Sequence, residues 1–123
     1  MNIVCIPVSD DRGLRAPVAA GLDAAPVLLF VETSSLTFRA VPNQAQRRRD
    51  RGCDPCEALD DTPVDAVLVE SIEPGALARI TRRGVRVLSG ARGTAAHALS
   101  DYVAGRLRRL LPAPNGDGPE RAR

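Results

Sequence analysis

The chain has 123 residues, of which 44% are hydrophobic and only 2% are aromatic. That length fits one modest domain with an aliphatic core, and the shortage of aromatic rings excludes stacking platforms for single-stranded nucleic acid. All seventeen basic residues are arginines, which excludes lysine chemistry. The formal net charge of +2 gives no overall attraction to nucleic acid or to a membrane surface.

The first half of the chain predicts three strands. Residues 2–8 form a β-branched apolar run that ends in a polar turn, and residues 27–31 are continuously apolar. Residues 36–41 alternate between apolar and polar side chains, so we expect a hairpin whose outer strand has one solvated face. Pro42 closes this hairpin.

The second half repeats a rhythm of strands and helices. Strands are expected over residues 64–69 and 85–88, and the helix between them, over residues 74–83, ends at Gly84. Together with the first half, this order predicts an α/β fold with one mixed sheet flanked by helices, because parallel strands need helical crossovers. We expect the solvated hairpin at one edge and the strand over residues 64–69 on the far side of the first strand.

The last predicted helix begins at its cap, Thr94, and continues to Leu111, because apolar residues recur every three or four positions up to Pro112. His97 falls on the polar face of this helix and is expected to be a surface residue, not a ligand. Residues 112–123 lack apolar periodicity and are predicted to be a disordered tail, so the folded domain spans residues 1–111.

Cysteine usage and the absence of apolar spans predict a cytoplasmic protein without a membrane partner. No apolar run has the length of a membrane span, and the chain does not open on a basic, cleavable leader. Cys5 lies in an apolar run and is expected to be a buried small hydrophobe. Cys53 and Cys56 have the C-x-x-C spacing, which in a reducing compartment suits a metal or redox site better than a disulfide.

Cys53 and Cys56 are expected to carry the chemistry of the chain. A short helix is predicted to begin beside them, because Asp54 can cap it, and a helix N-terminus favours thiolates. The chain also has cations just upstream, at Arg47, Arg48 and Arg49. These arginines favour the thiolates further and can attract an anionic cargo. Two thiolates supply only two of the four ligands of a closed metal site, so cluster sulfides, a second chain or exogenous ligands must complete it.

Other interpretations of these residues stay open at this point. The cysteines could be surface thiols without a function, and the arginines could form a solvated loop. Residues 53–56 also have the C-x-P-C form of thioredoxin-like thiol-disulfide oxidoreductases, although a polar loop precedes them where that fold has an apolar strand. Nucleic-acid binding by the arginines is the weaker alternative, because no aromatic residues are interleaved.

A series of short motifs accompanies the predicted elements along most of the chain. In chain order they are Ile6-Pro7-Val8-Ser9-Asp10-Asp11, Ala25-Pro26, Gly52-Cys53, Val64-Asp65-Ala66-Val67, Pro74-Gly75-Ala76-Leu77, Gly84-Val85-Arg86-Val87 and Tyr102-Val103-Ala104-Gly105. In order and spacing, the series resembles the dinitrogenase iron-molybdenum cofactor biosynthesis family, of the NifX and NafY type and including the C-terminal part of NifB. The resemblance covers roughly residues 1–110, which is nearly the whole of a one-domain chain.

The resemblance implies a ribonuclease H-like, three-layer fold with a five-stranded sheet. It also implies a non-enzymatic carrier, connected with nitrogen fixation, for a metal-sulfur cluster of the iron-sulfur or iron-molybdenum type or for its precursor. Cluster donor and acceptor proteins would then be its partners, and a cluster would be bound transiently at Cys53 and Cys56 with the three arginines nearby.

The chain departs from the family pattern at two places. Family members commonly carry His-Phe-Gly before the Ala-Pro of the second strand, where this chain has Gly21, Leu22 and Asp23, so the histidine suspected as a ligand is absent. Glu73 replaces the first glycine of the family's Ile-Gly-Pro-Gly. Both departures imply that this chain binds a different cargo from other family members, or that it binds the same cargo more weakly.

The composition of the tail predicts that it is dispensable for folding. Truncation after Pro112 should leave the melting temperature almost unchanged, because residues 113–123 contain no apolar pattern that could pack on the domain. Thermal unfolding of the truncated and full chains, followed by circular dichroism, measures this. A loss of several degrees would show that the tail packs.

Overall fold

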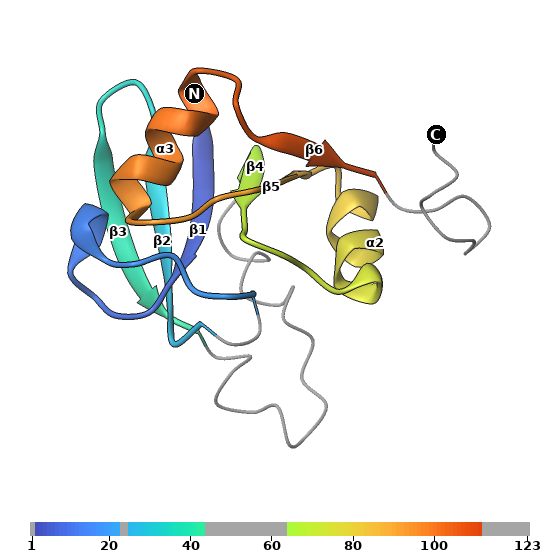
Figure 1. Ribbon diagram of the computed structural model, residues 1–123, viewed down its shortest axis with the longest axis horizontal. Coiled ribbons are helices and arrows are strands. Elements are labelled where there is room, and N and C mark those ends of the chain that lie inside the picture. Colours follow the sequence, from blue (N-terminus) through green and yellow to red (C-terminus); the bar gives the residue numbers. More distant parts are fainter. Residues whose placement is uncertain (1, 23–24, 44–63, 112–123) are drawn as a thin grey trace.

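The computed structural model describes residues 2–22, 25–43 and 64–111, and within them six strands form one mixed sheet (Figure 1). The strands are β1 (Ile3–Val8), β2 (Val27–Glu32), β3 (Thr37–Pro42), β4 (Ala66–Leu68), β5 (Arg86–Ser89) and β6 (Arg108–Leu110). The helices of these ranges are α2 (Pro74–Arg82) and α3 (Ala95–Val103), together with one 3-10 turn, η1 (Gly13–Arg15).

The strand order is β3-β2-β1-β4-β5-β6, which confirms the predicted position of the hairpin at one edge. β1 pairs antiparallel with β2 and parallel with β4, so β4 lies on the far side of the first strand, also as predicted. The outer strand β3 is more solvated than its alternating pattern indicated, because only Val41 is partly buried and the other five residues are exposed.

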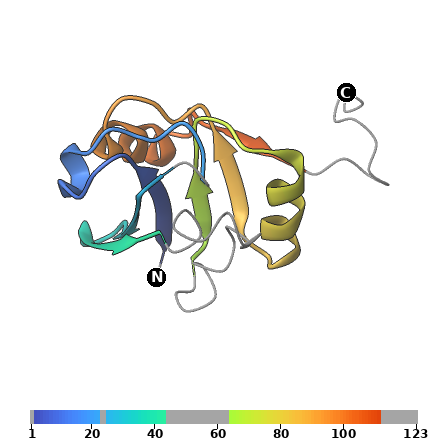
Figure 2. The same cartoon turned by 90° about the horizontal axis from the view of Figure 1, so that it is seen from below.

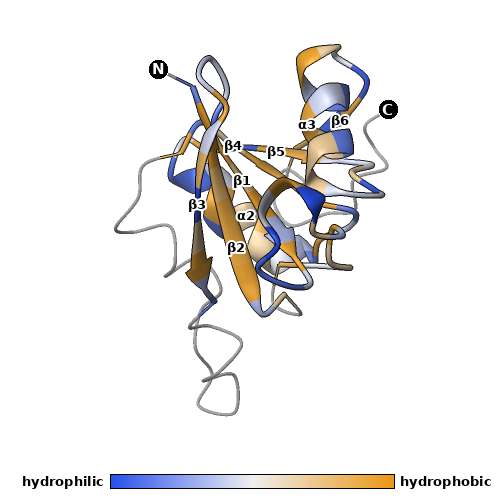
Figure 3. Ribbon diagram, turned by 90° about the vertical axis from the view of Figure 1, so that its left-hand side faces the viewer, coloured by the Kyte–Doolittle hydropathy of each residue, from blue (hydrophilic) through white to orange (hydrophobic). Residues whose placement is uncertain are grey.

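Two apolar cores lie on opposite faces of the sheet, so the domain has three layers (Figure 2). Alternate residues of β1 enter each core: Val4, Ile6 and Val8 face α3, whereas Cys5 faces α2. Hydrophobic residues line both β1 and β2 (Figure 3). Each Ile or Leu side chain that is completely buried contributes roughly 1.5–3 kcal/mol to the stability of the fold. The central strands therefore hold both helical layers.

The ends of α2 and the start of α3 follow the predicted local signals. Pro74 occupies the first helical position of α2, and Gly84, with a φ of 82°, lies just after its end. At α3, the Thr94 hydroxyl oxygen accepts a hydrogen bond from the His97 backbone N–H at 3.2 Å. Each helix boundary here is decided by interactions within one turn.

The prediction that the last helix continues to Leu111 is wrong, because α3 ends at Val103 and residues 108–110 form β6. The chain reverses at Gly105, whose φ is 77°. There the Gly105 N–H donates to the Tyr102 carbonyl at 3.1 Å and the Arg106 N–H donates to the Asp101 carbonyl at 2.8 Å. This pair of bonds is a Schellman motif, which satisfies the last carbonyls of the helix and excludes its continuation.

The sixth strand also corrects the five-stranded sheet that the family resemblance implies. β6 pairs antiparallel with β5, so Arg108 lies opposite Ser89 and Leu110 lies opposite Val87. Leu107, just before this strand, and Leu110, at its end, pack against opposite cores, whereas Leu111 is 63% exposed. The spacing of these leucines fits a helix as well as a strand, because so few residues cannot distinguish strand alternation from helical periodicity. The ribonuclease H-like assignment stays a prediction.

A carboxylate organises the turn of the β2–β3 hairpin. Glu32 accepts hydrogen bonds from the backbone N–H and the hydroxyl groups of Ser34 and Ser35, at distances between 2.6 and 3.3 Å. These hydrogen bonds, with those of the Ser35 and Ser34 hydroxyls largest, lower the pKa of Glu32 to about 2. The Leu36 N–H donates to the Glu32 carbonyl, and Leu36 itself has a positive φ of 61°.

Two predicted segments lie outside the described residues. They are the short helix expected at Asp54 and the tail over residues 112–123. Both stay predictions.

Gly13 and Gly75 provide a matched pair of Gly→Ala substitutions. Gly13 has a φ of 71°, and a methyl group there would lie 2.7 Å from the Phe38 ring. Gly13→Ala should therefore reduce the free energy of unfolding by about 1–2 kcal/mol. Gly75 lies at the start of α2, and a methyl group there would meet only Arg79 Nη1, at 3.5 Å, so Gly75→Ala should be neutral or stabilise by about 0.5 kcal/mol. Urea unfolding of both variants measures the difference, and equal effects would contradict it.

Candidate functional site

The predicted site residues lie outside the part of the chain that the structure describes. These are Cys53 and Cys56, expected as ligands, and Arg47, Arg48 and Arg49, expected as cations. The structure therefore does not bring these five residues together or separate them. The last described residue before them is Asn43, and the first described residue after them is Val64.

Asn43 holds the end of β3 in place through a buried side chain that is only 1% exposed. Its amide nitrogen donates to the carbonyl of Leu22 at 2.9 Å and to the carbonyl of Ala25 at 2.8 Å. Its backbone N–H donates to the carbonyl of Pro26 at 2.9 Å. Three hydrogen bonds thus join the residue that precedes the arginines to the segment before β2.

Asn43 lies at the sheet edge where β1 and β3 end. Val8, Val27 and Pro42 occupy one row across the first three strands, and β4 runs parallel to β1. β1 and β4 are neighbours in the sheet, but the chain continues from them in opposite directions along the strand order. It passes from β1 to β2 on one side and from β4 to β5 on the other. In open α/β sheets, ligands bind outside the carboxyl ends of strands at such a reversal. This carboxyl edge is our candidate functional site.

Segments from three parts of the chain meet at the carboxyl edge. The Ser71 hydroxyl, in the loop after β4, donates to the Ala20 carbonyl at 3.1 Å, and Asn43 bonds to the neighbouring Leu22. Glu73 follows in the same loop as the N-cap residue of α2, where its side chain makes no capping hydrogen bond. The two positions that depart from the family pattern, at Gly21–Leu22 and at Glu73, therefore both belong to segments of this edge.

Leu22 and Gly21 show what the departure from the His-Phe-Gly pattern means in space. Leu22 is only 2% exposed and packs in the core on the α2 side, so a branched aliphatic residue fills the place of the family's aromatic one. Gly21 is partly buried and presents no side chain that could bind a metal. This part of the edge therefore has a buried apolar residue at Leu22 and no imidazole at residue 21.

Cys5 is excluded from the site by burial, as expected from its sequence context. The thiol is completely buried in the α2-side core, and desolvation raises its pKa to about 12. A thiol with such a pKa stays protonated at neutral pH, and it is the thiolate that binds metals.

Within residues 2–22, 25–43 and 64–111, no three His, Cys, Asp or Glu side chains gather in a way that could hold a metal ion. In the same ranges, no helix is both long and apolar enough to cross a membrane.

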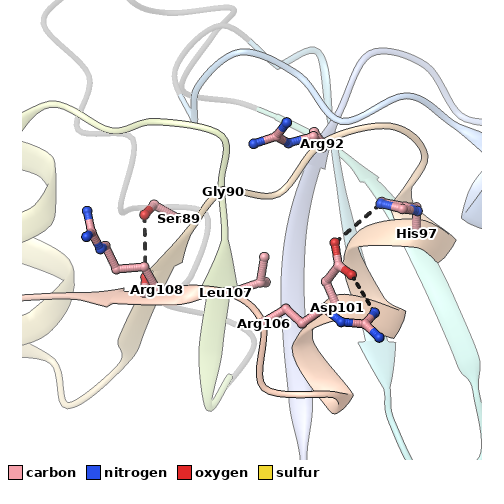
Figure 4. Close-up of a pocket in the computed structure, with 8 residues that line it drawn as sticks. All are labelled: Ser89, Gly90, Arg92, His97, Asp101, Arg106, Leu107 and Arg108. Carbon is pink, nitrogen blue, oxygen red and sulfur yellow. Dashed lines mark hydrogen bonds and ion pairs between the residues drawn. The ribbon is translucent and has the colours of Figure 1, made fainter.

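A second polar region, which the sequence did not predict, lies between α3, β6 and the end of β5 (Figure 4). It is an open pocket of about 490 Å³, lined by Ser89, Gly90, Arg92, His97, Asp101, Arg106, Leu107 and Arg108. His97 Nε2 lies 3.3 Å from Asp101 and Arg106 Nη1 lies 3.2 Å from it. His97 is exposed, which agrees with the predicted polar face, but Arg108 belongs to a strand and not to that helix.

A signal for this pocket was present at Gly105. Treated as a helix stop, that glycine ends α3 after Val103 and makes residues 106–110 available to return along β5. The apolar spacing of the later leucines conflicts with this stop, and it is the reason why the sequence predicts a helix that continues to Leu111.

The family model described as dinitrogenase iron-molybdenum cofactor matches residues 2–105. The chain belongs to this family. The match includes the three segments that form the described part of the carboxyl edge, and it ends where α3 turns toward β6. A search of the curated proteins finds no match to this member of the dinitrogenase iron-molybdenum cofactor family.

Solved structures similar to this family member share its fold. The apo form of the orange protein from Desulfovibrio gigas is 17% identical with a TM-score of 0.78, and the alignment covers 94% of this chain and 98% of that one. A protein from Thermotoga, proposed to be a NifB protein, is 18% identical with a TM-score of 0.72 over 95% and 100% of the two chains. A proposed dinitrogenase from Methanocaldococcus jannaschii is 11% identical with a TM-score of 0.68 over 92% and 99%.

The hydrogen bonds of Asn43 predict that it supports the carboxyl edge. Asn43→Ala should lower the free energy of unfolding by about 2 kcal/mol, because it leaves two buried carbonyls without donors. Ser71→Ala, which removes one exposed hydroxyl bond, should cost less than about 0.5 kcal/mol. Chemical denaturation measures both. An Asn43→Ala variant as stable as Ser71→Ala would show that the amide does not hold this edge.

Proposed function

We propose that the chain is a non-enzymatic binding or carrier protein for a metal-sulfur cluster, of the iron-sulfur or iron-molybdenum type, or for its precursor. The observation that carries this proposal is membership of the dinitrogenase iron-molybdenum cofactor family over residues 2–105. The fold supports it, because structures with related names match nearly the full length of the chain. No observation on the described residues favours the thiol-disulfide alternative.

Cys53 and Cys56 are the proposed cluster ligands, and elimination among the soft ligands of the chain supports this choice. The chain contains three cysteines and one histidine. Cys5 is buried and protonated, and His97 pairs with Asp101 on α3. Two thiolates remain for the cluster, whose other coordination positions are filled by sulfides, by a second chain or by small ligands.

Arg47, Arg48 and Arg49 are proposed to attract the cargo to these thiolates. Metal-sulfide clusters carry negative charge, and a guanidinium offers several donors to a sulfide or oxygen acceptor. The three arginines precede Cys53 by only a few residues. Attraction of this kind acts on the rate and strength of capture and weakens as ionic strength rises.

Loss of the family histidine is compatible with this binding mode. Gly21 offers no ligand, so cysteine thiolates take over a role that an imidazole would otherwise share. Cluster donor and acceptor proteins are the proposed partners, and the cytoplasmic location stays a prediction.

Anaerobic reconstitution tests the proposal. The reduced protein, mixed with ferrous iron and sulfide or with thiomolybdate, should develop visible charge-transfer absorption and retain metal after gel filtration. Cys53→Ser and Cys56→Ser should each weaken uptake by at least about tenfold, because each removes one ligand. Cys5→Ala is the matched control, and it should leave uptake unchanged because Cys5 is buried.

Ionic strength separates the cations from the ligands. Replacing Arg47, Arg48 and Arg49 by Gln should weaken uptake at low salt and have little effect at high salt, because surface attraction is then screened. Three exposed arginines elsewhere, Arg15, Arg82 and Arg109, provide the charge-matched control. Cluster uptake that is unchanged by both serine substitutions would remove the cysteines from the proposal. Catalytic disulfide reduction by the metal-free protein would overturn the proposal in favour of an oxidoreductase.

A further inference from the structure

The two edges of the sheet, β3 and β6, are protected to different degrees (Figure 1). Proteins that stay monomeric commonly keep an edge strand short or charged, because an unprotected edge pairs with further strands. β6 follows this rule, since it has only three residues and two of them are exposed arginines. β3 has six residues and a single charge, at Arg39. The β3 edge is therefore the one that is open to a further strand.

The register of the hairpin fixes which backbone groups of β3 point away from β2. The Asn43 N–H donates to the Pro26 carbonyl at 2.9 Å, and this pair continues the register of β2 and β3. Hydrogen-bonded and non-hydrogen-bonded pairs alternate along an antiparallel ladder. The residues whose backbone groups face β2 are therefore Thr37, Arg39 and Val41. Phe38 and Ala40 direct their N–H and C=O groups outward.

A hydrogen bond on the other side of β2 gives the same assignment. The Thr33 N–H donates to the Asn2 carbonyl at 2.9 Å, which assigns the odd-numbered residues of β2 to β1 and leaves the even-numbered ones for β3. The outer edge of β3 thus presents the N–H groups of Phe38 and Ala40. It also presents carbonyls, including that of Pro42, which has no N–H to satisfy. Among the described residues, no strand pairs with this edge.

The side chains of β3 add apolar surface to the unpaired backbone. Phe38 lies opposite Val31, on the face of the sheet that α3 covers, and is nevertheless 49% exposed. Arg39 lies on the other face, where its guanidinium carbon is 5.8 Å from the centre of the Phe30 ring of β2. The single charge of the strand is therefore held over the sheet and does not guard the edge.

We propose that two copies of the chain pair through β3, antiparallel and about a two-fold axis at Ala40, so that their sheets become continuous. A second copy fits this edge because antiparallel pairing of identical strands places each outward N–H opposite a carbonyl. The two Ala40 residues exchange two hydrogen bonds, and the Phe38 N–H of each protomer donates to the Pro42 carbonyl of the other. All outward N–H groups of the two strands are then paired.

Charge and strand length select this axis over its neighbours. An axis at Arg39 would place the two arginines directly opposite each other, and like charges in that position are destabilising. An axis at Phe38 or Val41 would leave one outward N–H opposite a residue beyond the partner strand. The axis at Ala40 instead places Arg39 opposite Val41. The interface is smaller than the roughly 800 Å² per partner of a standard complex, so we expect a dissociation constant in the micromolar range or weaker.

Sedimentation equilibrium of the full chain under reducing conditions tests the dimer. The average mass of the wild type should rise from 13.1 kDa toward twice that value as the concentration increases from about 10 μM to about 1 mM. Ala40→Arg places two charges at the axis and Ala40→Pro removes the central N–H, so each should weaken association at least about tenfold. Ala40→Val keeps the N–H and should associate like the wild type. Ala96→Arg adds the same charge at an exposed position of α3 and is the matched control.

Hydrogen exchange at single amides, followed by NMR, tests the strand pairing itself. The N–H groups of Phe38 and Ala40 should exchange rapidly in dilute protein and slow down as the dimer forms. Those of Arg39 and Val41 should be protected at both concentrations, because they already bond to β2. Association through side chains alone would not produce this alternation. Circular dichroism and thermal unfolding confirm that each variant is folded.

Four results would overturn the proposal. These are a wild type that stays monomeric up to about 1 mM, association unchanged by both Ala40→Arg and Ala40→Pro, an equal loss in Ala96→Arg, or exchange of the Phe38 and Ala40 amides that does not depend on concentration. Cys53→Ser/Cys56→Ser should associate like the wild type, and its failure to do so would assign the dimer to the cysteines. Cluster uptake by Ala40→Arg should stay normal, so the dimer and the cluster site fail independently.

Discussion

The pairing of β1 on both sides is the constraint on which the rest of the structure depends. β1 is hydrogen-bonded to β2 antiparallel and to β4 parallel, and its side chains alternate between two cores. A shift of one residue would move Cys5 to the α3 side and exchange every apolar contact of this strand between the faces. Its register therefore fixes the position of both helices at once.

This arrangement gathers the candidate functional regions around the ends of the strands. Asn43 stands where β3 ends, Ser71 connects the segments that follow β1 and β4, and Ser89 and Gly90 begin the pocket after β5. Backbone groups leaving a sheet need new partners, so side chains and ligands are favoured there. The candidate regions therefore lie where the chain leaves the sheet.

Interactions within one turn were predictable from the sequence, and pairing between distant residues was predictable only where apolar patterns determined it. The Thr94 cap, the start of α2 at Pro74 and its stop at Gly84 depend on neighbouring residues, and the structure confirms all three. The expected strand order followed from which strands tolerate solvent. At Gly105 two local signals competed, the leucine periodicity and the glycine stop, and the hydrogen bonds of the Schellman motif decided between them.

By itself, the sequence determined the α/β class, the buried thiol of Cys5, the hairpin at the edge and the family, because apolar alternation, caps and motif order are properties of the chain alone. It also named Cys53 and Cys56 as the chemical candidates. Only the tertiary structure decided that β6 exists and that it pairs with β5. The physical reason is that β6 obtains its hydrogen bonds from β5, about twenty residues earlier, and such partners are specified by the packing of the complete sheet.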